Sequence, residues 1–119
     1  MGTMTKYTGG CHCGAVRYET ESDLSMVISC NCSHCEIKGL VLTFVPPTQF
    51  TLTTGEDKLS DYKFNKHVIQ HRFCSICGVQ PFGFGKDPEG NDVVALNVRT
   101  FDGHVFDTVT PMPFSGRDI

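Results

Sequence analysis

The seven cysteines of this chain constrain its fold more than any other feature, because they fall in three short clusters. The first cluster is a Cys-x-Cys pair, the second combines two spacings within six residues, and the third is a Cys-x-x-Cys pair. In chain order the clusters contain Cys11 and Cys13, then Cys30, Cys32 and Cys35, then Cys74 and Cys77. Four thiolates close a structural zinc site, whereas three protein ligands leave one coordination position open for chemistry. Seven thiols therefore indicate one site of each kind, with two zinc ions per chain.

Length and composition predict one small domain that gains from metal staples. The chain has 119 residues, 39% of them hydrophobic, and it lacks tryptophan. A domain of this size buries only a modest core. Twelve glycines and six prolines favour turns and short strands. We expect a single zinc-binding domain over residues 6–119, with residues 1–5 as a disordered start or an expression remnant.

Charge and hydropathy argue against two classes of partner. The net charge is −3 with no long block of like charge, whereas nucleic-acid binding needs a basic face. No apolar run approaches the roughly 18 residues of a membrane span, and no signal peptide precedes Tyr7. We therefore expect a cytoplasmic protein with reduced thiols and with no nucleic-acid or membrane partner. The alternative is a disulfide framework, which would leave one of the seven thiols over.

Short runs of β-branched and aromatic residues predict an all-β fold, a zinc-stapled tent of antiparallel strands with little or no helix. Two of these runs, Leu59–Phe64 and His67–Phe73, are expected to form a hairpin that turns at Asn65-Lys66. Only Glu56–Tyr62 could make one helical turn, and its apolar spacing is poor. The predicted strands are Ala15–Thr20, Met26–Ser29, Leu40–Val45, Gln49–Thr53, Leu59–Phe64, His67–Phe73 and Val93–Val98.

The first and third clusters are suited to grip one ion together. Cys74-x-x-Cys77 followed by Gly78 is typical of a zinc knuckle, in which backbone amides donate to the sulfurs and the glycine permits a sharp turn. In an extended chain Cys11 and Cys13 would point to the same face, since residues two apart do so. A Cys₄ site built from both pairs would link segments more than 60 residues apart. An iron–sulfur cluster on the same four residues is a further alternative.

The middle cluster offers three thiolates and one histidine. Cys30, Cys32 and Cys35 can converge on one ion from a strand end and the turn that follows it, and we favour three ligands plus water or an external thiol. His34 would lie inside a Cys32–Cys35 knuckle, where it could not easily reach the same metal. Two alternatives remain open: Cys30 or Cys35 joins another pair in a single Cys₄ site, or a histidine, His34 or His71, completes a closed Cys₃His site.

Four segments of the sequence resemble the motifs of a known protein family. Residues 9–18, 30–35, 72–78 and 97–99 read GGCHCGAVRY, CNCSHC, RFCSICG and NVR, which is similar to the four motifs of the glutathione-dependent formaldehyde-activating enzymes, the group that includes centromere protein V. The motifs stand in the family order, and all seven cysteine positions agree. The resemblance implies a β-tent fold shared with methionine sulfoxide reductase B. It also implies a structural zinc on the cysteines of the first and third clusters, and a functional zinc on those of the second.

The activity implied by the resemblance is condensation of glutathione with formaldehyde to S-(hydroxymethyl)glutathione, formally a carbon–sulfur lyase reaction. This chain is much shorter than the formaldehyde-acting members, so the substrate does not carry over directly. A metal-bound thiol is deprotonated and nucleophilic, and His34 is the nearest residue able to supply a proton to the product. Its alternative role is to orient a cysteine sulfur.

Three cysteinates give the open site a net charge of −1, so an anionic thiol peptide requires cations nearby. Lys38 follows the middle cluster, and Arg72 and Arg99 lie in the family motifs. Asn97 and Arg99 would share a face of a strand and together bind a carboxylate. Two alternatives to an enzyme are a non-catalytic thiol carrier, or a zinc-stabilised interaction module. A redox role like that of the sulfoxide reductases needs a free cysteine, and metal would occupy all seven.

Overall fold

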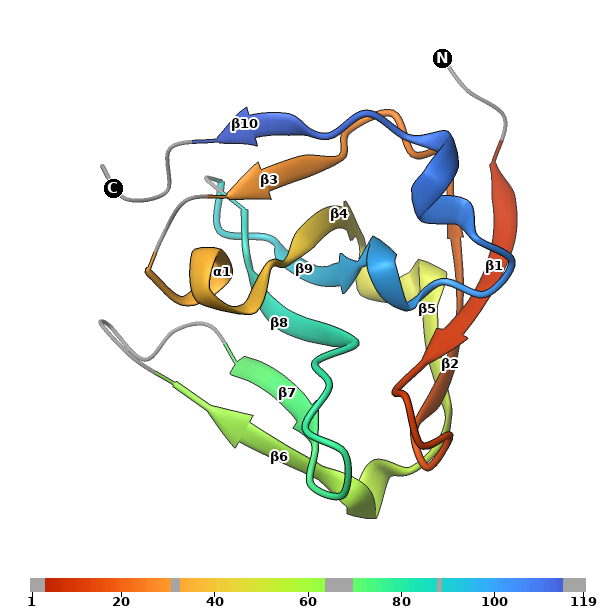
Figure 1. The fold of residues 1–119 in the computed structure, drawn as a ribbon. Coiled ribbons are helices and arrows are strands. Elements are labelled where there is room, and N and C mark those ends of the chain that lie inside the picture. The colour runs from red at the N-terminus through yellow and green to blue at the C-terminus, as the bar shows by residue number, and fades with distance from the viewer. Residues whose placement is uncertain (1–3, 31–32, 64–69, 88, 115–119) are drawn as a thin grey trace.

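The computed structural model of the chain describes residues 4–30, 33–63, 70–87 and 89–114. Short strands dominate, joined by tight turns and single helical turns (Figure 1). The elements are β1 (Thr5–Gly10), β2 (Arg17–Ser22), β3 (Ile28–Cys30), α1 (Ser33–Lys38), β4 (Val41–Val45), η1 (Pro47–Gln49), β5 (Phe50–Thr54), η2 (Glu56–Lys58), β6 (Leu59–Tyr62), β7 (Gln70–Cys74), β8 (Phe82–Lys86), β9 (Asp92–Asn97), η3 (Val98–Thr100), η4 (Val105–Thr108) and β10 (Met112–Phe114), where η marks a 3₁₀ helix. The predicted all-β class is confirmed.

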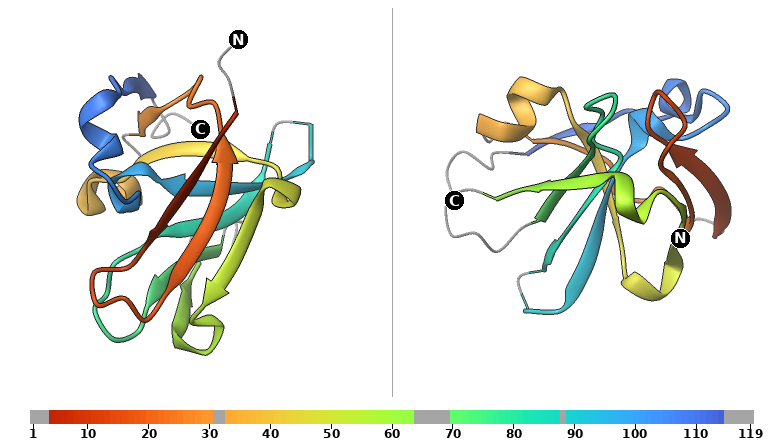
Figure 2. Two further views of the ribbon diagram at one scale, coloured as in Figure 1. Left: turned by 90° about the vertical axis from the view of Figure 1, so that its right-hand side faces the viewer. Right: turned by 90° about the horizontal axis from the view of Figure 1, so that it is seen from below.

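The strands form two sheets. The smaller has the order β1-β2-β5, and the larger has the order β10-β3-β4-β9-β8-β7-β6. All pairs are antiparallel except the edge pair β10–β3, which is parallel. Figure 2 shows the smaller sheet crossing over one face of the larger one. The face of the larger sheet that meets the smaller sheet borders the main core, and its other face is left for α1.

The main core lies between the two sheets. Tyr18 from β2, Phe82 from β8 and Leu96 from β9 are at most 1% exposed. The rings of Phe50 and Phe82 lie 4.7 Å apart, and that of Tyr18 meets the Phe82 ring edge-on at 6.0 Å. Aromatic pairs of this geometry add to the free energy gained by burying apolar area. Phe82 is completely buried.

A smaller apolar cluster occupies the other face of the larger sheet. Its buried members are Cys35, Leu40 and Leu42, and Cys30 packs against them. Because Leu42 alternates along β4 with the core residues Val41 and Thr43, the two clusters lie on opposite faces of one strand. Helix α1 therefore covers the face opposite the main core.

Helix α1 is the main departure from the expected secondary structure. The sequence predicted a tight turn after the strand end at Cys30, and the structure has a six-residue helix there. The helix ends at Gly39, whose φ is +68°. The amide of Leu40 donates to the Cys35 carbonyl at 3.0 Å and that of Gly39 to the Glu36 carbonyl at 3.3 Å, the Schellman pattern of a helix C-terminus. Leu40 and Cys35 also make the apolar contact that accompanies this pattern.

The other strands follow the predicted ones with shifts of a few residues. The sequence did not single out β1, β8 or β10. The β6–β7 hairpin is present, with Leu59 opposite Cys74, and its predicted turn at Asn65-Lys66 lies outside the described residues. No helix in the described part of the chain has the length and apolarity needed to cross a membrane.

Candidate metal centre

Four cysteines from the first and third clusters come together at one end of the molecule. The sulfurs of Cys11, Cys13, Cys74 and Cys77 all lie within 4.8 Å of one another. The Cys11 and Cys13 sulfurs are 3.6 Å apart, and those of Cys13 and Cys74 are 3.7 Å apart. A tetrahedral site with zinc–sulfur bonds of 2.3 Å has sulfur–sulfur edges of about 3.8 Å. The group thus has the donors, the number and the spacing of a Cys₄ metal site.

A turn, rather than the expected extended segment, brings the first pair together. The amide of Cys11 donates to the Val16 carbonyl at 3.1 Å, and the amide of Gly14 donates to the Cys11 carbonyl at 3.3 Å. Strand β2 accordingly begins at Arg17, two residues later than predicted. The expectation of an extended Cys-x-Cys segment was therefore wrong. The two sulfurs converge because the chain curls around them.

The third cluster has the local geometry expected of a knuckle. The amide of Gly78 donates to the Cys74 carbonyl at 2.8 Å, and Gly78 has a φ of +82°, a conformation that side chains disfavour. The amide of Ile76 points at the Cys74 sulfur at 3.4 Å, and in the first cluster the amide of Val16 points at the Cys11 sulfur at 3.3 Å. Such N–H···S contacts stabilise thiolates.

Two of the four thiols, those of Cys13 and Cys77, have pKa values shifted in opposite directions. Burial opposes the thiolate of Cys77, but amides of Val79 and Cys13 lower the pKa of Cys77 to about 6. For Cys13 the Ala15 amide lowers the pKa, yet burial and the neighbouring cysteines raise it to about 11. Four negative sulfurs this close repel one another, and a divalent cation between them removes that repulsion. The repulsion among the four thiolates therefore agrees with a cation bound at this cluster.

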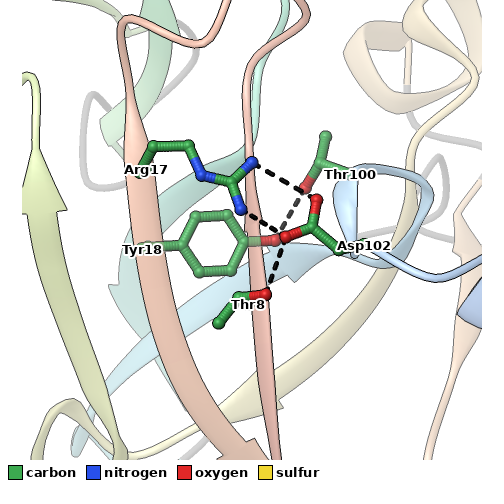
Figure 3. Close-up of polar contacts among 5 residues, drawn as sticks. All are labelled: Thr8, Arg17, Tyr18, Thr100 and Asp102. Atoms are coloured by element: carbon green, nitrogen blue, oxygen red, sulfur yellow. Dashed lines mark hydrogen bonds and ion pairs between the residues drawn. The ribbon is translucent and has the colours of Figure 1, made fainter.

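A polar network fixes the strand that leads into the first cluster (Figure 3). The guanidinium of Arg17 pairs with the Asp102 carboxylate, to which Thr8 also donates at 2.7 Å. These contacts lower the pKa of the Asp102 carboxyl, Arg17 first and Thr8 second. The hydroxyl of Tyr18 bonds that of Thr100 at 2.7 Å. Together these contacts join β1 and β2 to the segment after β9.

Sequence reasoning missed Asp102 and Thr100. Each lies more than 80 residues from the partner it holds, so no local pattern could reveal the pairing. The only sequence signal was their place just after the segment NVR.

The second cluster lies on the opposite side of the larger sheet, around α1. Cys30 is the last residue of β3 and Cys35 is in α1, and both belong to the small apolar cluster. Their convergence agrees with a shared site. Cys32 lies outside the described residues.

His34 faces strand β7. Its ring stacks on that of Tyr62 at 5.5 Å and lies 3.9 Å from that of His71. Burial lowers the pKa of His34, and the nearby charge of Lys38 lowers it further. Both histidines favoured as alternative ligands for a Cys₃His site thus lie side by side next to the second cluster.

Lys38, at the end of α1, also turns toward β7. Its Nζ donates to Gln80 Oε1 at 2.8 Å and lies 5.1 Å from the centre of the Phe73 ring. Burial lowers the pKa of Lys38, although the Cys35 thiolate opposes this. Lys38 is therefore a cation held beside the second cluster.

Asn97 and Arg99 have separate roles. Strand β9 ends at Asn97, and Arg99 lies in η3 rather than on the predicted strand. The buried Asn97 amide donates to the Gln80 carbonyl at 3.0 Å and accepts from the Arg99 amide at 3.2 Å. The Arg99 side chain donates from Nε to the Gly39 carbonyl at 2.9 Å, next to the end of α1.

Arg72 is committed elsewhere. Its Nε donates to Asp61 at 2.9 Å, and its guanidinium lies 5.6 Å from the centre of the Phe84 ring. Phe84 packs against the main core, on the face away from α1. The cations near the second cluster in the described part of the chain are therefore Lys38 and Arg99.

Fold and site together define a small two-sheet β-protein with a Cys₄ cluster that could hold a metal ion. Residues 6–112 match the family described as glutathione-dependent formaldehyde-activating enzyme, and the chain belongs to that family. This confirms the family resemblance.

One solved structure supports the fold assignment. It is the crystal structure of a Rhodobacter sphaeroides protein determined by structural genomics, with 24% identity and a TM-score of 0.79, covering 90% of this chain and 99% of that chain. The family supports thiol–aldehyde adduct chemistry in general, with glutathione as the thiol.

Proposed function

We propose that this chain promotes addition of the glutathione thiol to formaldehyde, the S-(hydroxymethyl)glutathione synthase reaction of a zinc-dependent carbon–sulfur lyase. In this reaction the thiol sulfur bonds to the carbonyl carbon, the carbon–oxygen π bond breaks, and the thiol proton ends on the new hydroxyl oxygen. The observation that carries the proposal is the family match over residues 6–112. We also propose a reducing compartment such as the cytoplasm, since the thiols must stay reduced.

The cysteines would divide between two zinc ions. Cys11, Cys13, Cys74 and Cys77 would hold a structural ion, a role supported by their mutual distances. The second cluster, Cys30, Cys32 and Cys35, would hold a functional ion with an open fourth position. When bound there, zinc would lower the pKa of an incoming thiol and supply a thiolate at neutral pH.

Side chains around α1 would donate a proton and bind the charged groups of the substrate. His34 is the candidate proton donor to the alkoxide oxygen, and its ring contacts with Tyr62 and His71 would hold its ring in place. The ammonium of Lys38 would offset the negative charge of the thiolates and attract an anionic peptide. Arg99 would contact a carboxylate of the substrate, with Asn97 positioning the backbone of Arg99.

The proposal is tested by exchange spectroscopy. Zinc-loaded protein should accelerate exchange between glutathione and its formaldehyde adduct, measured by NMR line broadening or magnetisation transfer. Cys32→Ser should abolish the acceleration, and His34→Gln should reduce it by about tenfold or more, as expected for loss of a general acid.

An unchanged exchange rate with fully zinc-loaded protein would contradict the proposal. Thiol–aldehyde addition also proceeds without an enzyme, so calorimetry should accompany the exchange experiment. Binding of glutathione without acceleration would identify a thiol carrier instead. If neither binding nor acceleration occurs, the zinc-stabilised interaction module becomes the better description.

A further inference from the structure

A cavity of about 320 Å³ opens between η3 and η4, the two helical turns that follow β9 in Figure 1. Its walls combine two aromatic rings with two side chains of opposite charge. The lining residues are Arg99, Phe101, Gly103, His104, Phe106 and Asp107. Sequence reasoning identified only Arg99 among them.

Arg99 and Asp107 share this cavity without neutralising each other. Among the described residues, the ion pairs include neither side chain, so their charged atoms lie more than 4.0 Å apart. Within the same part of the chain, the Asp107 carboxylate and the terminal nitrogens of Arg99 have no hydrogen-bond partner. A cation and an anion held apart in one cavity match a ligand that carries both charges.

The Arg99 side chain is held in position by other contacts. Its guanidinium lies 4.2 Å from the centre of the Phe106 ring, and its Nε donates to the Gly39 carbonyl. The planar fork is thus oriented, while the two terminal nitrogens remain to bind a carboxylate bidentately. His104, which also lines the cavity, has a φ of +58°, an uncommon conformation that is often found at ligand sites.

The cavity lies within reach of the second cysteine cluster. Ile28, Leu42 and Asn97 stand opposite one another on β3, β4 and β9. Cys30 comes two residues after Ile28, and Arg99 comes two residues after Asn97. Strands β3 and β9 run in the same direction, because each is antiparallel to β4. Neighbouring strands are about 4.8 Å apart, so the backbones at Ile28 and Asn97 are roughly 10 Å apart. An extended tripeptide spans about the same length.

We propose that this cavity binds the zwitterionic α-amino-acid end of a thiol peptide, the γ-glutamyl end in glutathione. Its α-carboxylate meets Arg99 and its α-ammonium meets Asp107. The glycyl end carries a carboxylate alone and leaves Asp107 without a partner. The inference rests on the proposed function for the identity of the thiol, since the second cluster receives the sulfur.

The test uses S-methylglutathione, whose sulfur cannot form a thiolate, with zinc-loaded protein and NMR titration. Asp107→Asn should weaken binding by about tenfold, the loss expected for one charge-assisted hydrogen bond. For N-acetyl-S-methylglutathione, which lacks the ammonium, the same substitution should change nothing. Glu89→Gln removes an exposed carboxylate on the β8–β9 turn and is the matched control, with binding unchanged.

Arg99→Lys keeps the charge and loses the fork, so it should weaken both ligands. The proposal is overturned if Asp107→Asn affects both ligands equally, if S-methylglutathione does not bind, or if free glutamate binds more tightly than S-methylglutathione. Binding of a thioether does not depend on catalysis. A normal binding pattern with no accelerated exchange would therefore refute the proposed reaction alone, and the reverse outcome would refute this cavity alone.

Discussion

At the scale of single residues, Gln80 connects three elements around the second cluster. Its side-chain oxygen accepts from Lys38 on α1 at 2.8 Å, and its side-chain nitrogen faces His71 Nδ1 on β7 at 3.5 Å. With the oxygen committed to an ammonium, the nitrogen side of the amide faces the imidazole, so Nδ1 accepts and carries no proton. Gln80 also lies only two residues after the knuckle at Cys74–Gly78. A neutral His71 therefore completes the link between knuckle, strand and helix.

His71 should make stability dependent on pH. Burial, with the charges of His34 and Lys38, lowers its pKa to about 4 in the folded state, against about 6.5 in the unfolded chain. Between these values the unfolded chain binds a proton that the folded chain does not. The free energy of unfolding should therefore fall as pH drops from about 6.5 to about 4, measured by urea denaturation.

His71→Gln is the comparison that isolates this effect, because metal release at low pH affects both proteins. The variant should show a shallower fall over the same pH range. Parallel profiles for the two proteins would mean that His71 is protonated to the same extent in both states.

At the scale of elements, the C-terminus of α1 controls where Cys35 and Lys38 stand. Gly39 has a φ of +68°, and an added Cβ there would meet nothing within 4 Å. The cost of a side chain at this position is thus one of backbone conformation alone. Because the same residue supplies the carbonyl that Arg99 binds, the cap also joins α1 to the cavity between η3 and η4.

Gly39→Ala should destabilise the protein by about 1 kcal/mol, the cost of a left-handed conformation for a residue with a Cβ. Gly39→Asn should cost less, since asparagine tolerates that conformation. Thermal unfolding of the zinc-loaded variants measures both. Equal stability of the glycine and alanine proteins would contradict the left-handed cap.

The sequence predicted these elements unevenly, for physical reasons. Buried strands such as β4 and β9 have continuous β-branched and apolar runs, which are readable locally. Helix α1 is too short for an apolar period, and the only signal was a glycine after a basic residue, Lys38-Gly39. The cysteine pairs were predicted to meet because their ligand chemistry limits the partners, whereas the Arg17–Asp102 and Arg99–Asp107 relations depend on tertiary packing alone.

At the scale of the whole molecule, the Cys₄ cluster joins the two sheets. Cys11 and Cys13 lie between β1 and β2 of the smaller sheet, whereas Cys74 ends β7 of the larger sheet and Cys77 lies between β7 and β8. Figures 1 and 2 show these two loops side by side at one end of the core. A structural zinc site contributes on the order of 10 kcal/mol, which is comparable to the entire stability of a small domain. An ion there would hold together the layers that enclose the main core.

The second cluster has a different place in this architecture. Cys30 lies on the outer face of the larger sheet, and Cys35 lies in α1, the helix that packs on that face. Removing a ligand there leaves the sheet-to-sheet packing untouched. The two clusters should therefore respond differently to loss of one cysteine.

The most direct test of this division is native mass spectrometry of the purified protein and of two matched variants. The wild-type chain should carry two zinc ions. Cys32→Ser should remain folded with one ion, whereas Cys74→Ser should be unfolded or insoluble. One zinc ion in the wild-type protein, or equal damage from the two substitutions, would contradict the assignment of one cluster to the fold and the other to function.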